Sequence, residues 1–222
     1  MKERFLKTGL EKFEEHEVME LLLYYCVPRQ DVNELSHRLV DRFGSVLQVV
    51  QAPERELMKV EGVGKGITTF LQLLNETNRY LNISEGKYGK QMCSVSDYGK
   101  YLVNFFVGIP NEVVYLLCMD AKAQVICCQI VAEGSVTSAN ISIRKLLDLA
   151  IGSNASSVVL AHNHPGGFAV PSGEDKITTM RVAKALYLAD VELVDHVIVA
   201  GKDYISMRAS GLYNPYEICI DD

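Results

Sequence analysis

Two histidines separated by one residue follow an apolar run in the second half of the chain. Residues 158–161 read Val-Val-Leu-Ala, and His162, Asn163, His164 and Pro165 come directly after them. Side chains alternate along a β-strand, so that residues i and i+2 point to the same face. Both imidazoles are therefore expected to face one point, as two ligands of a single metal ion must.

A carboxylate follows the two histidines at a distance that suits a third ligand. Seven residues separate His164 from Ser172, and two more separate Ser172 from Asp175. Two imidazoles and one carboxylate leave a fourth position open, which distinguishes catalytic zinc from closed structural zinc. Ser172 and Asp175 also fit the S-x-x-D capping box at the start of a helix. One arrangement satisfies both interpretations, with Ser172 at the helix start and Asp175 one turn inside.

The second half of the chain has the pattern of predicted helices and strands that is typical of an α/β domain. Helical apolar spacing occurs near residues 143–152 and 173–189. Short β-rich runs separated by turns surround these helices, and they cover residues 112–119, 125–131, 158–161, 194–200 and 204–207. The histidine pair is therefore predicted at the end of one strand and Asp175 at the start of one helix.

The first half has helical spacing and a glycine hairpin. Apolar residues recur at helical intervals in residues 17–51, and Gly62-Val63-Gly64-Lys65 lies between two further helical stretches. This hairpin resembles the helix-hairpin-helix element of DNA-repair proteins. Glycine permits positive φ in the turn and lets backbone N–H groups approach a phosphate. The resemblance implies DNA contacts by Gly62, Gly64 and Lys65, although such hairpins also serve only to connect packed helices.

The spacing of His162, His164, Ser172 and Asp175 is that of the JAMM (MPN+) metallopeptidase signature, and His162-Asn163-His164-Pro165 with its flanking segments resembles the RadC (UPF0758) family. The resemblance implies two domains. A small all-α helix-hairpin-helix domain is followed by an α/β JAMM/MPN domain, cytidine deaminase-like, with a central mixed sheet. Residues 82–99 are polar and contain several glycines, as a connection between domains does. This segment places the first domain at 1–85, the linker at 86–99 and the second domain at 100–222.

The resemblance also implies a reaction, the hydrolysis of a peptide or isopeptide bond in a peptide or protein substrate. One Zn²⁺ per chain would be held by His162, His164 and Asp175. Such an ion lowers the pKa of its bound water toward about 7 and polarises the scissile carbonyl.

Enzymes of this type need a glutamate on an earlier strand. Glu112 begins a segment that resembles the first strand of the family and is the predicted general base, with Glu133 as the alternative. Ser172 is predicted to orient the attacking water or to donate to the oxyanion. His196 with Asp195 fits a pair that supports the metal ligands from outside, but the favoured interpretation of His196 is a packed strand histidine.

Charge limits the other functions that the chain can have. With 22 basic and 28 acidic side chains the net charge is −6, which speaks against a dominant basic surface for nucleic acid. Residues 1–90 carry 13 basic and 14 acidic groups, so a local DNA contact remains open there. The alternative function is therefore a DNA-binding accessory protein of repair or recombination with structural zinc. A protein-interaction module without turnover is a third hypothesis, and a nucleobase deaminase is excluded because the chain lacks P-C-x-x-C.

The sequence predicts a cytoplasmic protein with no membrane partner. The charged N-terminus lacks the apolar stretch of a signal peptide, and no apolar run approaches the roughly 18 residues that span a bilayer. The six cysteines are therefore expected to be reduced.

Overall fold

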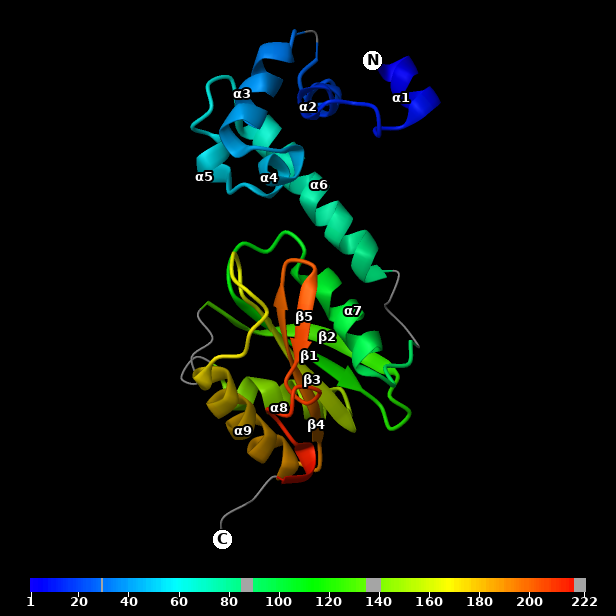
Figure 1. The fold of residues 1–222 in the computed structure, drawn as a ribbon, viewed down its shortest axis with the longest axis vertical. Coiled ribbons are helices and arrows are strands. Elements are labelled where there is room, and N and C mark those ends of the chain that lie inside the picture. The colour runs from blue at the N-terminus through cyan, green and yellow to red at the C-terminus, as the bar shows by residue number, and fades with distance from the viewer. Residues whose placement is uncertain (29, 85–89, 135–140, 218–222) are drawn as a thin grey trace. The chain divides into compact units, whose positions relative to one another are not determined.

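The computed structural model of the 222-residue chain describes residues 1–28, 30–84, 90–134 and 141–217. Its internal contacts cluster into two compact units, Met1–Asn78 and Arg79–Asp222 (Figure 1). Each unit has a hydrophobic core of its own.

The first unit is helical. Its helices are α1 (Lys2–Thr8), α2 (Glu15–Leu23), α3 (Asn33–Phe43), α4 (Val46–Gln51), α5 (Glu54–Leu57) and the first part of α6 (Lys65–Ser84). The sequence shows why α3 ends and α4 begins where they do. Gly44 ends α3 in the left-handed conformation at φ 91°, and the Ser45 hydroxyl accepts the Gln48 N–H at the start of α4.

The glycine hairpin connects α5 to α6. Gly62 has φ 92°, a value that favours glycine, whereas Gly64 shows no such requirement. The Gly64 carbonyl accepts the first helical N–H groups of α6, from Ile67 and Thr68. Val60 and Val63 pack into the helical core on either side of the turn. The structure thus shows two helices joined by a tight glycine turn, and the predicted helix-hairpin-helix assignment stays a prediction.

The second unit contains one mixed five-stranded sheet. Its strands are β1 (Val113–Met119), β2 (Val125–Glu133), β3 (Ser157–Asn163), β4 (Glu192–Ala200) and β5 (Asp203–Ser206), in the order β2-β1-β3-β4-β5. The strands β3 and β4 are parallel, and the other neighbouring pairs are antiparallel. The predicted mixed sheet is confirmed, and its strands lie where the five β-rich runs predicted them.

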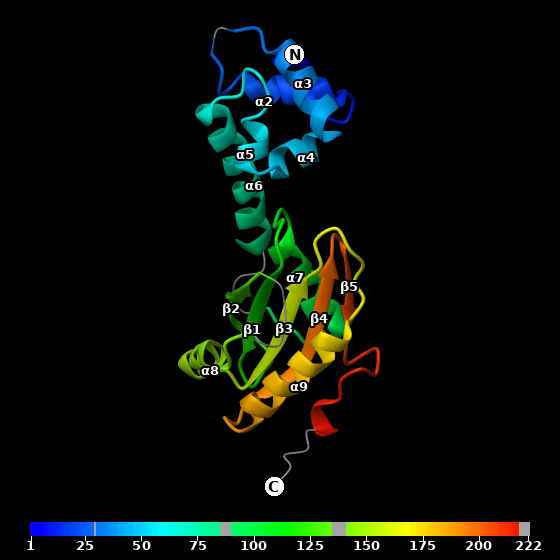
Figure 2. The ribbon, with the colours of Figure 1, turned by 90° about the vertical axis from the view of Figure 1, so that its left-hand side faces the viewer.

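Helices cover both faces of this sheet. Helix α7 (Val95–Phe106) packs on one face, whereas α8 (Ile143–Gly152) and α9 (Gly173–Tyr187) pack on the other (Figures 1 and 2). Alternation along the strands supplies both cores. In β1, for example, Val114, Leu116 and Cys118 face α8 and α9, while the residues between them face α7. The second unit is therefore a three-layer α/β/α arrangement.

The segment predicted as a linker is partly structured. Residues 85–89 lie outside the described residues, but Met92 and Tyr98 are buried in the core beneath α7, and α7 begins at Val95. Ser94 caps this helix, so polar residues that suggested a linker instead mark a helix start. Residues 95–99, predicted as the end of the linker, belong to α7 instead. The predicted domain boundaries otherwise stay a prediction.

Two sequence expectations concern the whole chain. No helix in the described ranges is long and apolar enough to cross a membrane. The five cysteines within those ranges are free thiols, and Cys219 lies outside them.

Candidate metal centre

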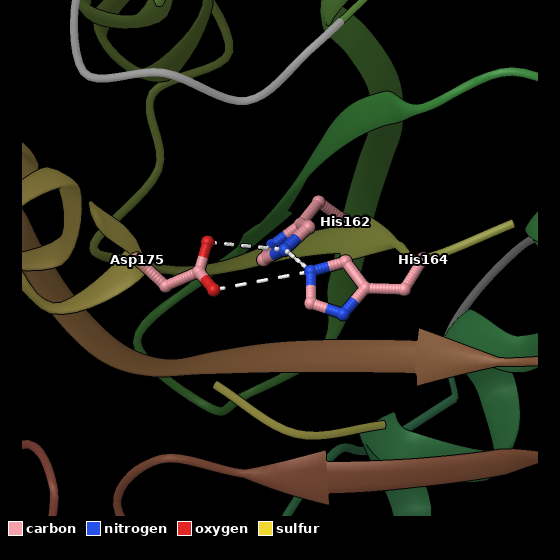
Figure 3. A group of neighbouring side chains, drawn as sticks. All are labelled: His162, His164 and Asp175. Atoms are coloured by element: carbon pink, nitrogen blue, oxygen red, sulfur yellow. Dashed lines mark hydrogen bonds and ion pairs between the residues drawn. The ribbon is translucent and has the colours of Figure 1, made fainter. Parts of the chain in front are cut away.

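The two histidines lie at the end of β3, the central strand of the sheet. An apolar run with every side chain from Val158 to Ala161 buried leads to His162, which is itself fully buried. The His164 N–H donates to the Val199 carbonyl at 2.8 Å, so the chain stays aligned with β4 for one further residue. Strand alternation therefore turns both imidazoles to the same face, as the spacing predicted (Figure 3).

Asp175 comes to the same point from the first turn of α9. Ser172 begins this helix with a reciprocal capping box. Its hydroxyl accepts the Asp175 N–H at 3.1 Å, while its own N–H and hydroxyl donate to Asp175 Oδ2 at 2.7 and 2.6 Å. The box holds the buried carboxylate with its other oxygen, Oδ1, turned toward β3.

The three side chains converge closely. His162 Nε2 lies 2.9 Å from His164 Nε2 and 3.2 Å from Asp175 Oδ1, and His164 Nε2 lies 3.9 Å from Asp175 Oδ2 (Figure 3). One ligand atom from each residue lies within 4.8 Å of the others. Two imidazole nitrogens and a carboxylate are the donor set that zinc takes in catalytic sites, so these residues fit a metal ion.

The hydrogen bonds of the histidines leave the converging nitrogens available. His164 Nδ1 lies 3.1 Å from the Phe168 carbonyl, which can only accept a proton, so Nδ1 of the neutral ring carries the hydrogen and Nε2 carries a lone pair. Burial lowers the pKa of His162 to about 4, although the Asp175 carboxylate opposes this shift. His162 is therefore a neutral imidazole at neutral pH, the form that binds metals.

The register of β1 distinguishes the two candidate glutamates. Val114 pairs with His162, and paired residues share a face, so Glu112, two residues earlier, falls on the histidine face. Glu133 pairs instead with Val113, whose side chain packs in the core beneath α7. The two glutamates thus belong to opposite faces of the sheet, and the register favours Glu112.

Asn163 lies between the two histidines and points to the other face, as alternation predicted. Its Oδ1 accepts the Val113 N–H at 2.8 Å, and its Nδ2 donates to the Asn111 carbonyl at 3.0 Å. These two bonds fix the chain on both sides of Glu112. The interpretation of Asn163 as a structural residue therefore agrees with its contacts.

His196 does more than pack. Its Nε2 lies 2.8 Å from His162 Nδ1, and its Nδ1 lies 2.7 Å from the Thr179 hydroxyl. Its neighbour Asp195 points elsewhere, to the hydroxyls of Tyr98 and Ser206. Sequence reasoning did not connect His196 to His162 because the contact depends on the pairing of β3 with β4. The only available signal was a second polar residue in an apolar strand.

The remaining predicted residues, Gly62, Gly64 and Lys65, belong to the helical unit and are not part of this centre.

Comparison with known proteins identifies the family. A family model described as a RadC-like JAB domain matches residues 92–212, which include all of the residues of this centre. The chain belongs to the RadC-like (UPF0758) family. A UPF0758 protein of Fusobacterium nucleatum is 31% identical over 219 residues, covering 96% of this chain and 94% of the relative. One from Thermotoga maritima is 33% identical over 211 residues, covering 95% of each chain. The names of these RadC-like relatives state no activity.

Proposed function

We propose that this RadC-like protein is a zinc-dependent hydrolase of the JAMM type that cleaves a peptide or isopeptide bond in a peptide or protein substrate. The observation that carries the proposal is the convergence of two imidazole nitrogens and a carboxylate on one point, from the end of β3 and the first turn of α9. When bound there, Zn²⁺ acidifies water and polarises a carbonyl.

The residues of the chain have distinct roles in this proposal. Glu112, at the edge of β1 on the histidine face, accepts a proton from the attacking water and passes it to the leaving amine. Asn163 contacts the backbone on both sides of Glu112, and the Gly134 N–H donates to the Glu112 carbonyl, so the backbone at this position is held by three hydrogen bonds. Ser172 orients Asp175 through the capping box, and its proposed donation to an oxyanion requires its hydroxyl to leave Asp175 Oδ2.

Digestion of a peptide library tests this function. Zinc-loaded protein should cleave a subset of peptides, detected by mass spectrometry as new termini. Glu112→Gln should retain zinc but lose cleavage by a factor of about 100 or more, since it removes the proton acceptor. The matched control is His164→Ala, a change at a partly exposed ligand that should remove both zinc and cleavage. Equal cleavage by wild type and Glu112→Gln would refute the assigned base.

A second candidate function is DNA binding by the glycine hairpin, and one observation favours it. Gly62 is required by its positive φ, but Gly64 has no positive φ, and a Cβ built on it meets nothing within 4 Å. Packing therefore gives no reason for a glycine directly before Lys65 and α6. Close approach of a phosphate to the backbone would supply one.

A salt titration with a fluorescent duplex tests this second function. Binding should weaken as salt rises, because released counterions drive phosphate contacts. Gly64→Asp should abolish binding without unfolding the protein. Gly152→Asp is the matched control, since Gly152 also has open space around it and lies in the other unit. Absence of binding at low salt would eliminate this candidate.

A further inference from the structure

A chain of hydrogen bonds runs behind the metal centre, through residues outside the ligand set. His162 Nδ1 contacts His196 Nε2 at 2.8 Å, His196 Nδ1 contacts Thr179 Oγ1 at 2.7 Å, and Thr179 Oγ1 contacts the Asp175 carbonyl at 2.5 Å. All four side chains are buried. This series of hydrogen bonds therefore begins at the proposed ligand His162 on β3 and ends at the backbone of the proposed ligand Asp175 on α9.

The last contact fixes the direction of the whole chain. A carbonyl oxygen can only accept, so the Thr179 hydroxyl must donate its single proton to Asp175. The Met207 sulfur, 3.4 Å from Thr179 Oγ1, is a weaker and more distant acceptor than this carbonyl at 2.5 Å. Thr179 Oγ1 therefore accepts from His196, whose Nδ1 carries the hydrogen.

The protonation of His196 then determines that of His162. His196 is fully buried, and its two ring nitrogens contact an imidazole and a hydroxyl rather than a carboxylate, so no anion compensates a charge on the ring, which is neutral and carries one hydrogen only. With that hydrogen on Nδ1, its Nε2 must accept from His162 Nδ1. His162 is left with a lone pair on Nε2, which lies 2.9 Å from the lone pair of His164 Nε2 and 3.2 Å from Asp175 Oδ1. No hydrogen lies in these two contacts, and a cation between the three atoms would relieve their repulsion.

We propose that Thr179 and His196 are positioning residues that hold His162 in the Nδ1–H tautomer, so that its Nε2 is ready to bind a metal ion. The inference rests on the proposed metal site. The hydrogen bonds that link His162, His196, Thr179 and the Asp175 carbonyl are called the relay below. Without the relay, His162 could carry its hydrogen on Nε2 and donate it to Asp175 Oδ1, which lies 3.2 Å away. Such a bond would occupy both ligands at once, and an entering ion would have to displace the proton.

The tautomer itself is measurable in metal-free protein. Long-range proton–nitrogen NMR correlations at neutral pH distinguish a protonated Nδ1 from a protonated Nε2. The relay predicts that His162 is found with Nδ1 protonated in the wild-type protein before zinc is added. Protonation at Nε2 would overturn the inference, whatever the metal does.

Substitutions at two adjacent threonines test the effect on the metal. Thr179→Val removes the hydroxyl with little change of shape and should weaken zinc affinity about 10-fold, as the loss of an outer-shell partner does. Thr179→Ser keeps the hydroxyl and should bind zinc within about 2-fold of wild type. Thr178→Val is the matched control, because Thr178 is equally buried on α9 and its hydroxyl has no partner among the described residues. It should bind zinc as wild type does.

Competition with a chromophoric chelator gives these affinities, and thermal unfolding shows whether each variant is folded. Equal zinc affinity of Thr179→Val and Thr178→Val would overturn the inference. If Thr179→Val fails to fold, the wild-type tautomer still decides. Wild-type protein that holds His162 with Nδ1 protonated but binds no zinc would refute the proposed function and leave the relay supported.

Discussion

Three consecutive residues on β3 show how single side chains divide the work of the site. His162 and His164 face the converging ligands, while Asn163 faces the opposite side and fixes the chain around Glu112. This division follows directly from strand alternation, and the sequence was sufficient to predict it. The partner of His162 on β4 was not predictable, because it depends on a register between segments that lie 34 residues apart.

At the residue scale, the buried imidazoles make the stability of the metal-free protein depend on pH. Burial depresses the pKa of His162 to about 4 and also lowers the pKa of His196, whereas an unfolded histidine titrates near 6.5. As the pH falls, the two histidines take up protons in the unfolded chain before they do so in the folded protein. The stabilisation of the folded protein by its neutral, buried rings is therefore complete above pH about 6.5 and is lost toward pH about 4. Each unit of pKa difference corresponds to about 1.4 kcal/mol.

Urea unfolding of chelator-treated protein at a series of pH values from about 7.5 to about 5 checks this prediction. The free energy of unfolding should decrease on acidification. His196→Gln removes one of the two titrating rings and should flatten the dependence, even if it lowers stability at every pH. A free energy of unfolding that stays constant or rises across this range would contradict the assignment of neutral, buried rings.

At the element scale, two helices of the second unit start with the same device. Ser94 and Asp97 begin α7 with a capping box, and Ser172 and Asp175 begin α9 with another. Only the second box contains a converging ligand. The sequence predicted the box at α9 because it precedes a helical pattern. It did not predict the box at α7, because Ser94 lies in a segment whose glycine and serine content is typical of a linker.

The two boxes form a matched pair of substitutions. Ser94→Ala and Ser172→Ala should each lower the free energy of unfolding by about 1 kcal/mol, the usual cost of a lost cap. Only Ser172→Ala should also weaken zinc binding, because it removes the hydroxyl that donates to Asp175 Oδ2 and leaves that oxygen with the backbone N–H of residue 172. Chemical denaturation and chelator competition measure the two effects. Zinc affinities that respond equally to both changes would show that the α9 box does not orient the ligand.

The packing of α7 on β5 depends on a single glycine. A Cβ at Gly99 would lie 2.2 Å from Cε2 of the Tyr204 ring, so Gly99→Ala should destabilise the protein by roughly 1–3 kcal/mol through overpacking. Tyr204→Ala removes the obstacle. In a double-mutant cycle measured by denaturant unfolding, the alanine at residue 99 should cost much less in the Tyr204→Ala background. Additive effects would contradict this close contact.

At the scale of the whole molecule, the candidate centre lies entirely within one of the two units. All three ligands, Glu112 and the relay belong to the second unit, whose two cores are built from its own sheet and helices. The positions of the five strands and of α8 and α9 were predictable from short apolar runs and turns, whereas α7 was not. The order of the strands was not, because pairing between distant segments leaves no local signal in the sequence.

This separation predicts that the second unit works alone. A fragment of residues 90–222 should unfold cooperatively and bind zinc with the affinity of the full chain, because the helical unit contributes no ligand. Circular dichroism during thermal unfolding and chelator competition check the two expectations. A fragment that folds but binds zinc much more weakly than the full chain would show that the helical unit contributes to the centre.

The central claim is that His162, His164 and Asp175 form one zinc site, and zinc stoichiometry tests it most directly. Wild-type protein, stripped with a chelator, reconstituted with excess Zn²⁺ and desalted, should retain about one zinc per chain by elemental analysis. Folded His164→Ala protein treated in the same way should retain almost none. Wild-type protein without stoichiometric zinc, or His164→Ala protein that keeps a full equivalent, would contradict the account.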